Sequence, residues 1–119
     1  MSATILAVDD SKTMQDFVKQ ALELGGYQVV LAADGKEALQ RFQENKIDAV
    51  VTDINMPVMD GLTFIVELRK INADVPIVTL TTESEEAMKK KGAEAGANGW
   101  IVKPFRPAQF LDIIKQLLS

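Results

Sequence analysis

The sequence predicts an α/β domain in which a parallel sheet carries helices on both of its faces. Short apolar runs alternate five times with longer stretches whose apolar residues recur at helical spacing. This alternation of strand and helix is typical of parallel sheets joined by right-handed crossovers. The chain has 119 residues, a length that suits one compact domain with its own core.

The five predicted strands are short and rich in β-branched residues. The first is a continuous apolar run, which is typical of a strand covered on both faces. The third ends directly before Asp53, and the first directly before Asp9 and Asp10. In order, the strands are predicted over residues 4–8, 28–31, 49–52, 76–80 and 99–102.

The five predicted helices follow these strands. Gly25 and Gly26 stop the first helix, and Asp60 is placed to cap the start of the third. The fourth, over residues 84–95, is the weakest, because it has few apolar residues and contains Gly92, which costs about 1 kcal/mol relative to Ala. The apolar residues of the other four are Met14, Phe17, Val18, Ala21 and Leu22; Ala38, Leu39 and Phe42; Leu62, Ile65 and Leu68; and Phe110, Ile113, Ile114, Leu117 and Leu118.

Composition excludes several kinds of chemistry. The chain contains no cysteine and no histidine, which rules out disulfides, thiolate metal sites and Ser–His or Cys–His nucleophiles within it. A net charge of -4 argues against nucleic acid as a partner. The first ten residues, MSATILAVDD, do not form a signal peptide, and no apolar stretch approaches the length of a membrane span. We therefore expect a cytoplasmic protein without membrane insertion.

Polar residues follow four of the five predicted strands. Asp9 and Asp10 follow the first, Asp53 the third, Thr81 the fourth and Lys103 the fifth. The carboxyl ends of parallel strands meet at one edge of the sheet, where ligands bind in such folds. We expect these side chains to converge there. Three clustered carboxylates repel one another, and a hard cation such as Mg²⁺, which prefers oxygen ligands, relieves that repulsion.

A carboxylate beside a metal ion and a lysine can act as a nucleophile toward phosphorus. Asp53 would then form an acyl phosphate, with Lys103 neutralising charge and Thr81 donating its hydroxyl to the phosphoryl group. Simpler interpretations exist for each residue: Asp9 and Asp10 as caps of the first helix, Asp53 as a plain loop residue, Lys103 as a solvated lysine at the rim, and Thr81 as a helix N-cap. The coincidence of polar residues at four strand ends favours the phosphoryl-transfer site.

The motifs at these strand ends resemble those of bacterial two-component response-regulator receiver domains, and the resemblance extends over residues 4–118. Among them, stand-alone chemotaxis response regulators are the most similar. The resemblance implies a flavodoxin-like (βα)5 three-layer sandwich with strand order 2-1-3-4-5, and one receiver domain over residues 1–119 with no output domain. The motifs are Asp9-Asp10, TDINMPVMDG around Asp53, TLTTES around Thr81, and Lys103-Pro104-Phe105.

The resemblance implies a phosphoacceptor rather than an enzyme acting on other substrates. Asp53 would accept a phosphoryl group from the phosphohistidine of a sensor histidine kinase, and the domain would catalyse both this step and its own dephosphorylation. Asp10, Asp53 and the backbone carbonyl of Asn55 would bind Mg²⁺ directly, whereas Asp9 would act largely through water. The phosphoryl oxygens would be held by Thr81 and Lys103.

The same resemblance implies a conformational switch and residues that set the lifetime of the acyl phosphate. Thr81 would move toward the phosphoryl group and Trp100 would turn inward, at a position where most chemotaxis members carry tyrosine. Asn55 and Glu83 would lie near the attacking water and give a short-lived acyl phosphate. The peptide bond before Pro104 would be cis.

The resemblance implies that the fourth helix, fifth strand and fifth helix form the output surface. This surface would bind the flagellar motor switch protein and so control flagellar rotation. A phosphatase would be a further partner. A phosphate sink or relay shuttle without motor binding is the main alternative, and the site residues do not separate the two. An FMN-binding flavodoxin-like protein is less favoured, because Asp9 and Asp10 would repel the phosphate of FMN. An aspartate-nucleophile phosphatase normally requires a D-x-D pattern after its first strand, which this chain lacks.

The predicted output surface carries four lysines, which we interpret first as a solvated face. They are Lys89, Lys90, Lys91 and Lys115.

Overall fold

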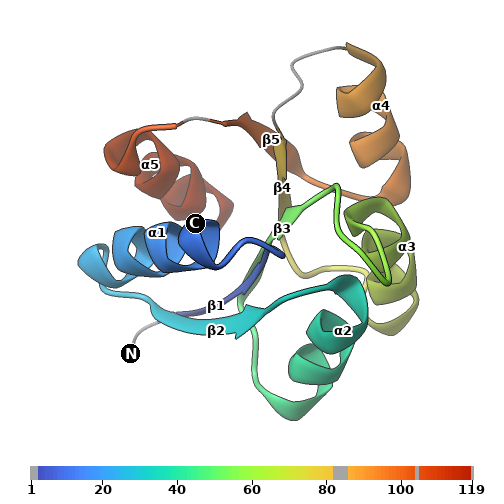
Figure 1. Ribbon diagram of the computed structural model, residues 1–119, viewed down its shortest axis with the longest axis horizontal. Helices are drawn as coiled ribbons and strands as arrows, with labels where there is room; N and C mark the ends of the chain where they lie inside the picture. The colour runs from blue at the N-terminus through green and yellow to red at the C-terminus, as the bar shows by residue number, and fades with distance from the viewer. Residues whose placement is uncertain (1–2, 82–85, 104, 119) are drawn as a thin grey trace.

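The chain folds into three layers, with a parallel sheet between two layers of helices (Figure 1). The computed structural model describes residues 3–81, 86–103 and 105–118. Neighbouring strands pair in parallel in the order β2-β1-β3-β4-β5, which confirms the predicted topology. The strands are β1 (Thr4–Val8), β2 (Gln28–Ala32), β3 (Ala49–Asp53), β4 (Ile77–Thr81) and β5 (Gly99–Val102).

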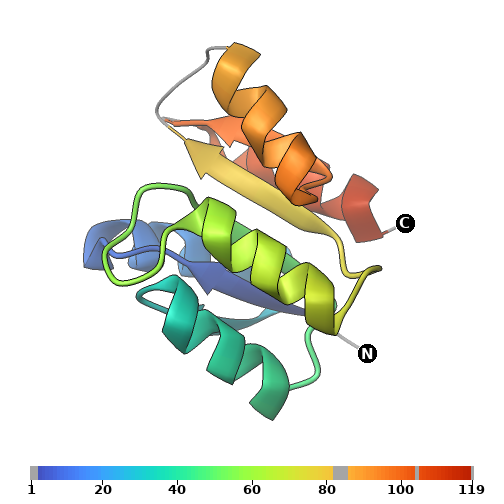
Figure 2. The same ribbon diagram turned by 90° about the vertical axis from the view of Figure 1, so that its right-hand side faces the viewer.

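Helices cover both faces of the sheet, as the alternating pattern predicts. Helices α1 (Lys12–Leu24) and α5 (Pro107–Leu118) lie on one face, and α2 (Gly35–Glu44), α3 (Gly61–Ile71) and α4 (Glu86–Ala95) lie on the other (Figure 1). The strand arrows point the same way in the orthogonal view (Figure 2). All five carboxyl ends therefore share one edge of the sheet.

The two faces of the sheet carry separate apolar cores, because successive side chains of a strand point to opposite faces. In β1, Ile5 and Ala7 pack in the core under α1 and α5, whereas Leu6 and Val8 pack in the core under α2 and α3. All four side chains are buried, as expected for a strand covered on both sides. The buried apolar side chains end at Val8, so Asp9 and Asp10 lie directly beyond the apolar core at the carboxyl end of β1.

Strand β4 starts and ends one residue later than predicted, at Ile77 and Thr81 rather than at 76 and 80. Pro76 has no N–H to donate to the ladder, although its carbonyl accepts a hydrogen bond from the N–H of Val50 at 2.8 Å. At the other end, Thr81 still pairs with Val102 of β5. Thr81 is thus the last residue of β4, and its interpretation as a helix N-cap stays a prediction, because residues 82–85 lie outside the described residues.

Helix α3 begins as predicted, with Oδ1 of Asp60 accepting a hydrogen bond from the N–H of Thr63 at 2.8 Å. Helix α4 includes Gly92, and its predicted start at residue 84 lies outside the described residues. Strand β2 extends one residue further than predicted, to Ala32, which pairs with Val8.

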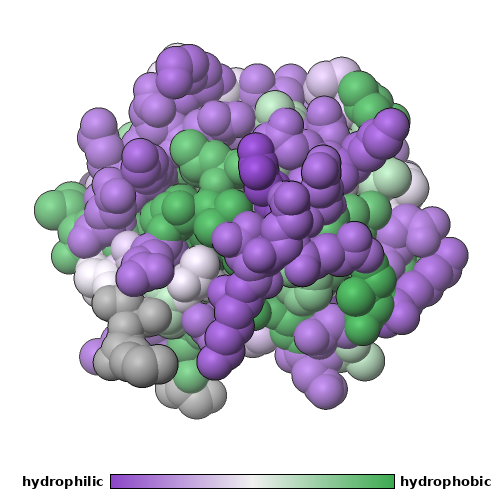
Figure 3. All heavy atoms as spheres, turned by 90° about the horizontal axis from the view of Figure 1, so that it is seen from below, coloured by the Kyte–Doolittle hydropathy of each residue, from purple (hydrophilic) through white to green (hydrophobic). Residues whose placement is uncertain are grey.

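Hydrophilic residues cover most of the face seen from below, and hydrophobic residues form separate small groups on it (Figure 3). Over the described ranges, none of the helices has the length and hydropathy needed to cross a membrane. Large apolar side chains exposed on the surface are spread over α1, the loop after β3, α3 and β5, and scattered residues of this kind are normal for folded domains. They are Phe17, Leu24, Val58, Val66, Ile71 and Trp100.

Candidate functional site

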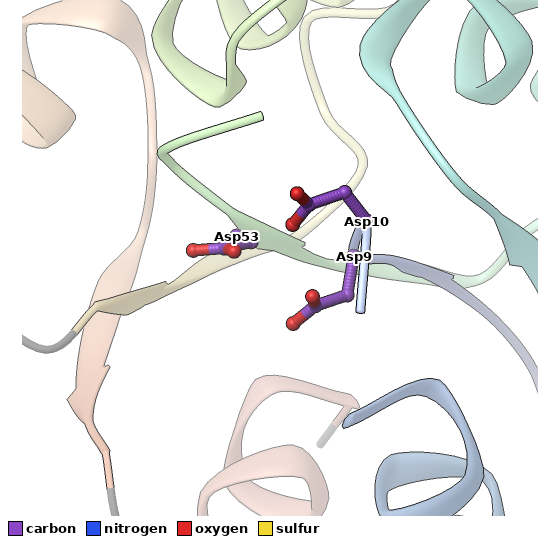
Figure 4. A group of neighbouring side chains, drawn as sticks. All are labelled: Asp9, Asp10 and Asp53. Carbon is purple, nitrogen blue, oxygen red and sulfur yellow. The ribbon is translucent and has the colours of Figure 1, made fainter. Parts of the chain in front are cut away.

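Three carboxylates gather at the carboxyl edge of the sheet, as the sequence predicts (Figure 4). Asp9 and Asp10 follow β1, and Asp53 ends the neighbouring strand β3. One carboxylate oxygen from each residue lies within 4.8 Å of the others. Asp9 is 3% exposed and Asp53 is 9% exposed, whereas Asp10 is open to solvent. Two of the three negative charges are therefore largely removed from water.

Lys103 supplies the positive charge of this cluster. Its Nζ lies 3.1 Å from Oδ2 of Asp9 and 3.5 Å from Oδ2 of Asp53, and the lysine side chain is only 14% exposed. The interpretation of Lys103 as a solvated rim lysine is therefore wrong. One ammonium faces two buried carboxylates, so the site retains excess negative charge.

Neither acid after β1 is the N-cap of α1, so that interpretation is also wrong. The cap is Ser11, whose hydroxyl accepts a hydrogen bond from the N–H of Met14 at 3.3 Å. Asp9 instead uses Oδ1 to accept the N–H of Ser11 at 2.9 Å and Oδ2 to accept from Lys103. The side chain of Asp10 makes no hydrogen bond or ion pair with any residue that the structure describes, which leaves its oxygens open to an external ligand.

The pKa of Asp53 is raised above its ordinary value of 3.8, and burial is the largest cause. The negative charge of Asp9 raises this pKa further, while the Lys103 ammonium and the N–H of Ile54, which donates to Oδ1 at 2.8 Å, act in the opposite direction. Ionisation of Asp53 is thus less favourable here than in water, and a bound cation would make it more favourable.

The donor set fits a divalent cation of the hard, oxygen-preferring class. All three side chains are carboxylates, and Mg²⁺ needs only a few protein oxygens because it keeps several waters. Both oxygens of Asp9 accept hydrogen bonds, whereas Oδ2 of Asp53 has only the longer 3.5 Å contact with Lys103, and the Asp10 carboxylate has no hydrogen bond among the described residues. The arrangement therefore favours Asp10 and Asp53 over Asp9 as direct ligands.

Thr81 and Lys103 lie side by side at the ends of neighbouring strands. The N–H of Lys103 donates to the carbonyl of Thr81 at 2.7 Å, and Thr81 is buried. Trp100, earlier on β5, pairs with Thr79 and is 45% exposed, with Nζ of Lys89 4.5 Å from the centre of its ring. The indole is thus at the surface in this structure, where a cation covers it.

Asn55 lies in the loop after β3 and is exposed. Two other predicted site residues, Glu83 and Pro104, lie outside the described residues. The structure accordingly brings together Asp9, Asp10, Asp53, Thr81 and Lys103 at one edge of the sheet.

Two residues that the sequence analysis did not single out also shape this site. Gln15, one turn into α1, donates from Nε2 to the backbone carbonyl of Asp9 at 2.7 Å. Gly61 packs so tightly against β3 that a Cβ there would overlap the carbonyl oxygen of Asp53. A glycine beside Asp60 signals only a turn in the sequence, and a glutamine on a helix carries no signal, because both roles depend on contacts between separate elements.

The receiver-domain model of response regulators matches residues 5–115 of this chain. The chain is 41% identical over 117 residues to the transcriptional regulatory protein PrrA of Mycobacterium tuberculosis, covering 98% of this chain and 50% of PrrA. It is 38% identical over 118 residues to the response regulator MprA of Mycobacterium sp. (strain KMS), covering 99% of this chain and 51% of MprA. The chain thus spans about half the length of these curated relatives.

Solved structures give the same assignment. Chemotaxis protein CheY4 of Vibrio cholerae is 41% identical with a TM-score of 0.95, covering 99% of this chain and 100% of that one. A CheY-like response regulator receiver domain protein from Methanospirillum hungatei is 30% identical with a TM-score of 0.93, covering 99% and 94%. Together with the family match, these similarities show that the chain belongs to the response regulator receiver domain family.

Proposed function

We propose that Asp53 accepts a phosphoryl group from a histidine kinase of a two-component system. The observation that carries this proposal is the contact of a largely buried Asp53 carboxylate with Lys103 at 3.5 Å, beside two further carboxylates. A carboxylate oxygen of Asp53 attacks phosphorus, and the bond from phosphorus to the histidine nitrogen breaks. The leaving imidazole keeps the electron pair and takes a proton from solvent, so an acyl phosphate and a neutral histidine result.

A Mg²⁺ ion would be held by Asp10, Asp53 and the carbonyl of Asn55. Asp9 would act through water, which agrees with the hydrogen bonds that already occupy both of its oxygens. The ion would neutralise charge on the phosphoryl oxygens during transfer. Removal of Mg²⁺ should therefore abolish phosphorylation without unfolding the domain.

Lys103 and Thr81 would bind the phosphoryl oxygens once the acyl phosphate has formed. Lys103 needs only to turn from Asp9 and Asp53 toward the new oxygens, because it already lies within 3.5 Å of Asp53. Asn55 and Glu83 would position the water that hydrolyses the acyl phosphate, in which the bond between phosphorus and the Asp53 oxygen breaks and inorganic phosphate leaves. Trp100 would turn inward as Thr81 moves, and the indole ring would then lose its contact with the Lys89 ammonium.

The phosphorylation step is tested with acetyl phosphate as the donor. The wild-type domain should take up one phosphoryl group with MgCl₂ and none with a chelator, and Asp53→Asn should take up none. Asp60→Asn is the matched control, because Asp60 lies in the same stretch of chain and asparagine caps a helix about as well as aspartate. Phosphoryl uptake by Asp53→Asn equal to that of the wild type would refute the proposal.

For the output we propose phosphorylation-dependent binding of the flagellar motor switch through α4, β5 and α5. Similarity to chemotaxis protein CheY4 along the full length of both chains supports this role. Similarity to PrrA supports a second candidate, in which this receiver controls transcription as part of a longer protein. That a receiver over residues 1–119 acts without an output domain remains a prediction.

Binding to a motor-switch peptide separates these outputs from a phosphate sink or relay shuttle. The acyl-phosphate mimic beryllofluoride with MgCl₂ should increase affinity for the peptide at least tenfold if the domain acts on the motor (about 1.4 kcal/mol). Equal binding with and without beryllofluoride would exclude the motor role. It would leave the sink, the relay shuttle and transcriptional control as the remaining outputs.

A further inference from the structure

Gln15 holds the peptide group that joins the two acids after β1. Its Nε2 donates to the carbonyl oxygen of Asp9 at 2.7 Å, across the first turn of α1. That carbonyl belongs to the peptide bond between Asp9 and Asp10. The side chain of Gln15 is half-buried, so this hydrogen bond is partly shielded from competing water.

This contact completes the restraint of Asp9. Its N–H donates to the carbonyl of Ala32 at 3.1 Å, Oδ1 accepts from Ser11, and Oδ2 accepts from Lys103. With the carbonyl held by Gln15, every polar atom of Asp9 has a partner. The first acid of the pair is therefore fixed by contacts on all sides.

Asp10 is restrained in a different way. Its carboxylate is exposed and has no hydrogen bond or ion pair among the described residues. Its direction depends on its own side-chain torsions and on the backbone that carries it, and that backbone starts at the peptide group held by Gln15. A change in the ψ torsion of Asp9, which the hydrogen bond from Gln15 to this carbonyl opposes, would move Asp10 and its carboxylate relative to the 4.8 Å cluster with Asp9 and Asp53.

We propose that Gln15 is a positioning residue that keeps Asp10 aimed at the cation by holding the Asp9–Asp10 peptide in place. The inference rests on the proposed function, since it assigns a role in the same cation site. Groups that hydrogen-bond to metal ligands commonly raise the affinity for the metal ion in this way, because a ligand that is already oriented loses less entropy on binding. Glutamine suits the position because its amide donates without adding charge to an acidic cluster.

The test compares Gln15→Met with the wild type by calorimetric titration of MgCl₂. Methionine has a similar length and helix propensity but no N–H donor. Gln20→Met is the matched control, because Gln20 lies exposed on the same helix and its side chain has no hydrogen bond within the described part of the chain. Gln15→Met should raise the Kd for Mg²⁺ about threefold to tenfold, and Gln20→Met should leave it unchanged.

Phosphorylation by acetyl phosphate at a series of MgCl₂ concentrations gives a second readout. Gln15→Met should need more Mg²⁺ for half-maximal rate but reach the wild-type rate at saturation, because the ion itself then holds Asp10. In ¹⁵N NMR spectra without Mg²⁺, the amide nitrogen of Asp10 should shift in Gln15→Met, since it senses the hydrogen bond to the Asp9 carbonyl. The amide of Leu6, within β1, should not shift.

Two results would overturn the inference while leaving the proposed function intact. One is an unchanged Kd for Mg²⁺ in Gln15→Met. The other is a lower maximal rate at saturating MgCl₂ with no change in the concentration required, which would assign Gln15 another role. If the wild-type domain neither binds Mg²⁺ nor takes up phosphate, the proposed function itself fails, and the inference fails with it.

Discussion

Lys103 contacts Asp53 through a 3.5 Å ion pair that joins the ends of β5 and β3, which are not adjacent in the sheet. The same ammonium is closer to Asp9, at 3.1 Å, so it is shared between two buried acids. This sharing leaves the site with more negative than positive charge. The stability of the metal-free domain and its affinity for Mg²⁺ both depend on that imbalance.

Replacement of Lys103 by methionine should destabilise the metal-free domain and tighten its binding of Mg²⁺. The buried Asp9 and Asp53 would lose their counter-charge, at a cost of about 1–3 kcal/mol in the free energy of unfolding. A cation would then enter a more negative site. Urea unfolding with and without MgCl₂ measures both effects, with Lys115→Met, an exposed lysine on α5, as the control. Weaker Mg²⁺ binding by Lys103→Met would contradict this account of the charge balance.

Asp53→Asn should raise the melting temperature at neutral pH without Mg²⁺. Because burial raises the pKa of Asp53 in the folded state, the folded domain holds this proton more strongly than the unfolded chain. Stability from this residue is therefore present at low pH and lost as pH rises from about the ordinary value of 3.8 through the raised pKa. The advantage of Asp53→Asn should disappear in acid, and it should shrink when MgCl₂ stabilises the wild type. A variant less stable than the wild type at neutral pH would oppose this prediction.

Arg69→Met should lower the stability of the whole domain by about 2–4 kcal/mol. The guanidinium of Arg69 uses all five of its N–H donors on four acceptors around the C-terminal ends of α3 and α4. Removal of the side chain leaves several partly buried oxygens without a donor. Denaturant unfolding measures the loss, and Lys70→Met is the control because its ion pair with Glu67 is exposed. The acceptors are the carbonyls of Asn72, Val75 and Gly96 and the side-chain oxygen of Asn98.

Substitution of alanine should have opposite effects at Gly92 and Gly61. A Cβ at Gly92 of α4 would lie 3.8 Å from Thr79, an ordinary contact, and alanine favours the helix, so Gly92→Ala should stabilise the domain by about 0.5–1 kcal/mol. A Cβ at Gly61 would overlap the carbonyl of Asp53, so Gly61→Ala should destabilise the domain and slow phosphorylation. Thermal unfolding and acetyl phosphate labelling of both variants check this contrast. Equal effects of the two substitutions would argue against it.

The sequence pattern was sufficient to predict a parallel sheet and the residues at its carboxyl edge, whereas the strand order was implied by the resemblance to receiver domains. Apolar runs predict where the strands end. Parallel pairing then brings Asp9, Asp53 and Lys103 to one edge of the sheet, whatever the packing of individual side chains. The helix cap at Ser11 and the contact of Gln15 with Asp9 could not be predicted in this way. Several polar residues near a helix start can compete for the same backbone groups, and only the final geometry selects among them.

The hydrogen bonds of Arg69 illustrate a second limit. An arginine on a helix is ordinarily solvated, and no spacing in the sequence relates Arg69 to the carbonyl of Gly96 in another element. Its contact arises because α3 and α4 end at the same side of the molecule, which follows from the topology only after the helices have been placed. The fold is therefore encoded by local patterns, whereas such contacts depend on tertiary structure.

The proposed function depends on one step, the transfer of a phosphoryl group to Asp53 in the presence of Mg²⁺. Its most direct test is borohydride reduction of the domain after incubation with acetyl phosphate, which converts a phosphorylated aspartate to homoserine, followed by peptide mapping. We expect homoserine at position 53 alone, in samples with MgCl₂ and not in samples with a chelator. Homoserine at position 9, 10 or 60, or an equal yield without the metal ion, would contradict it.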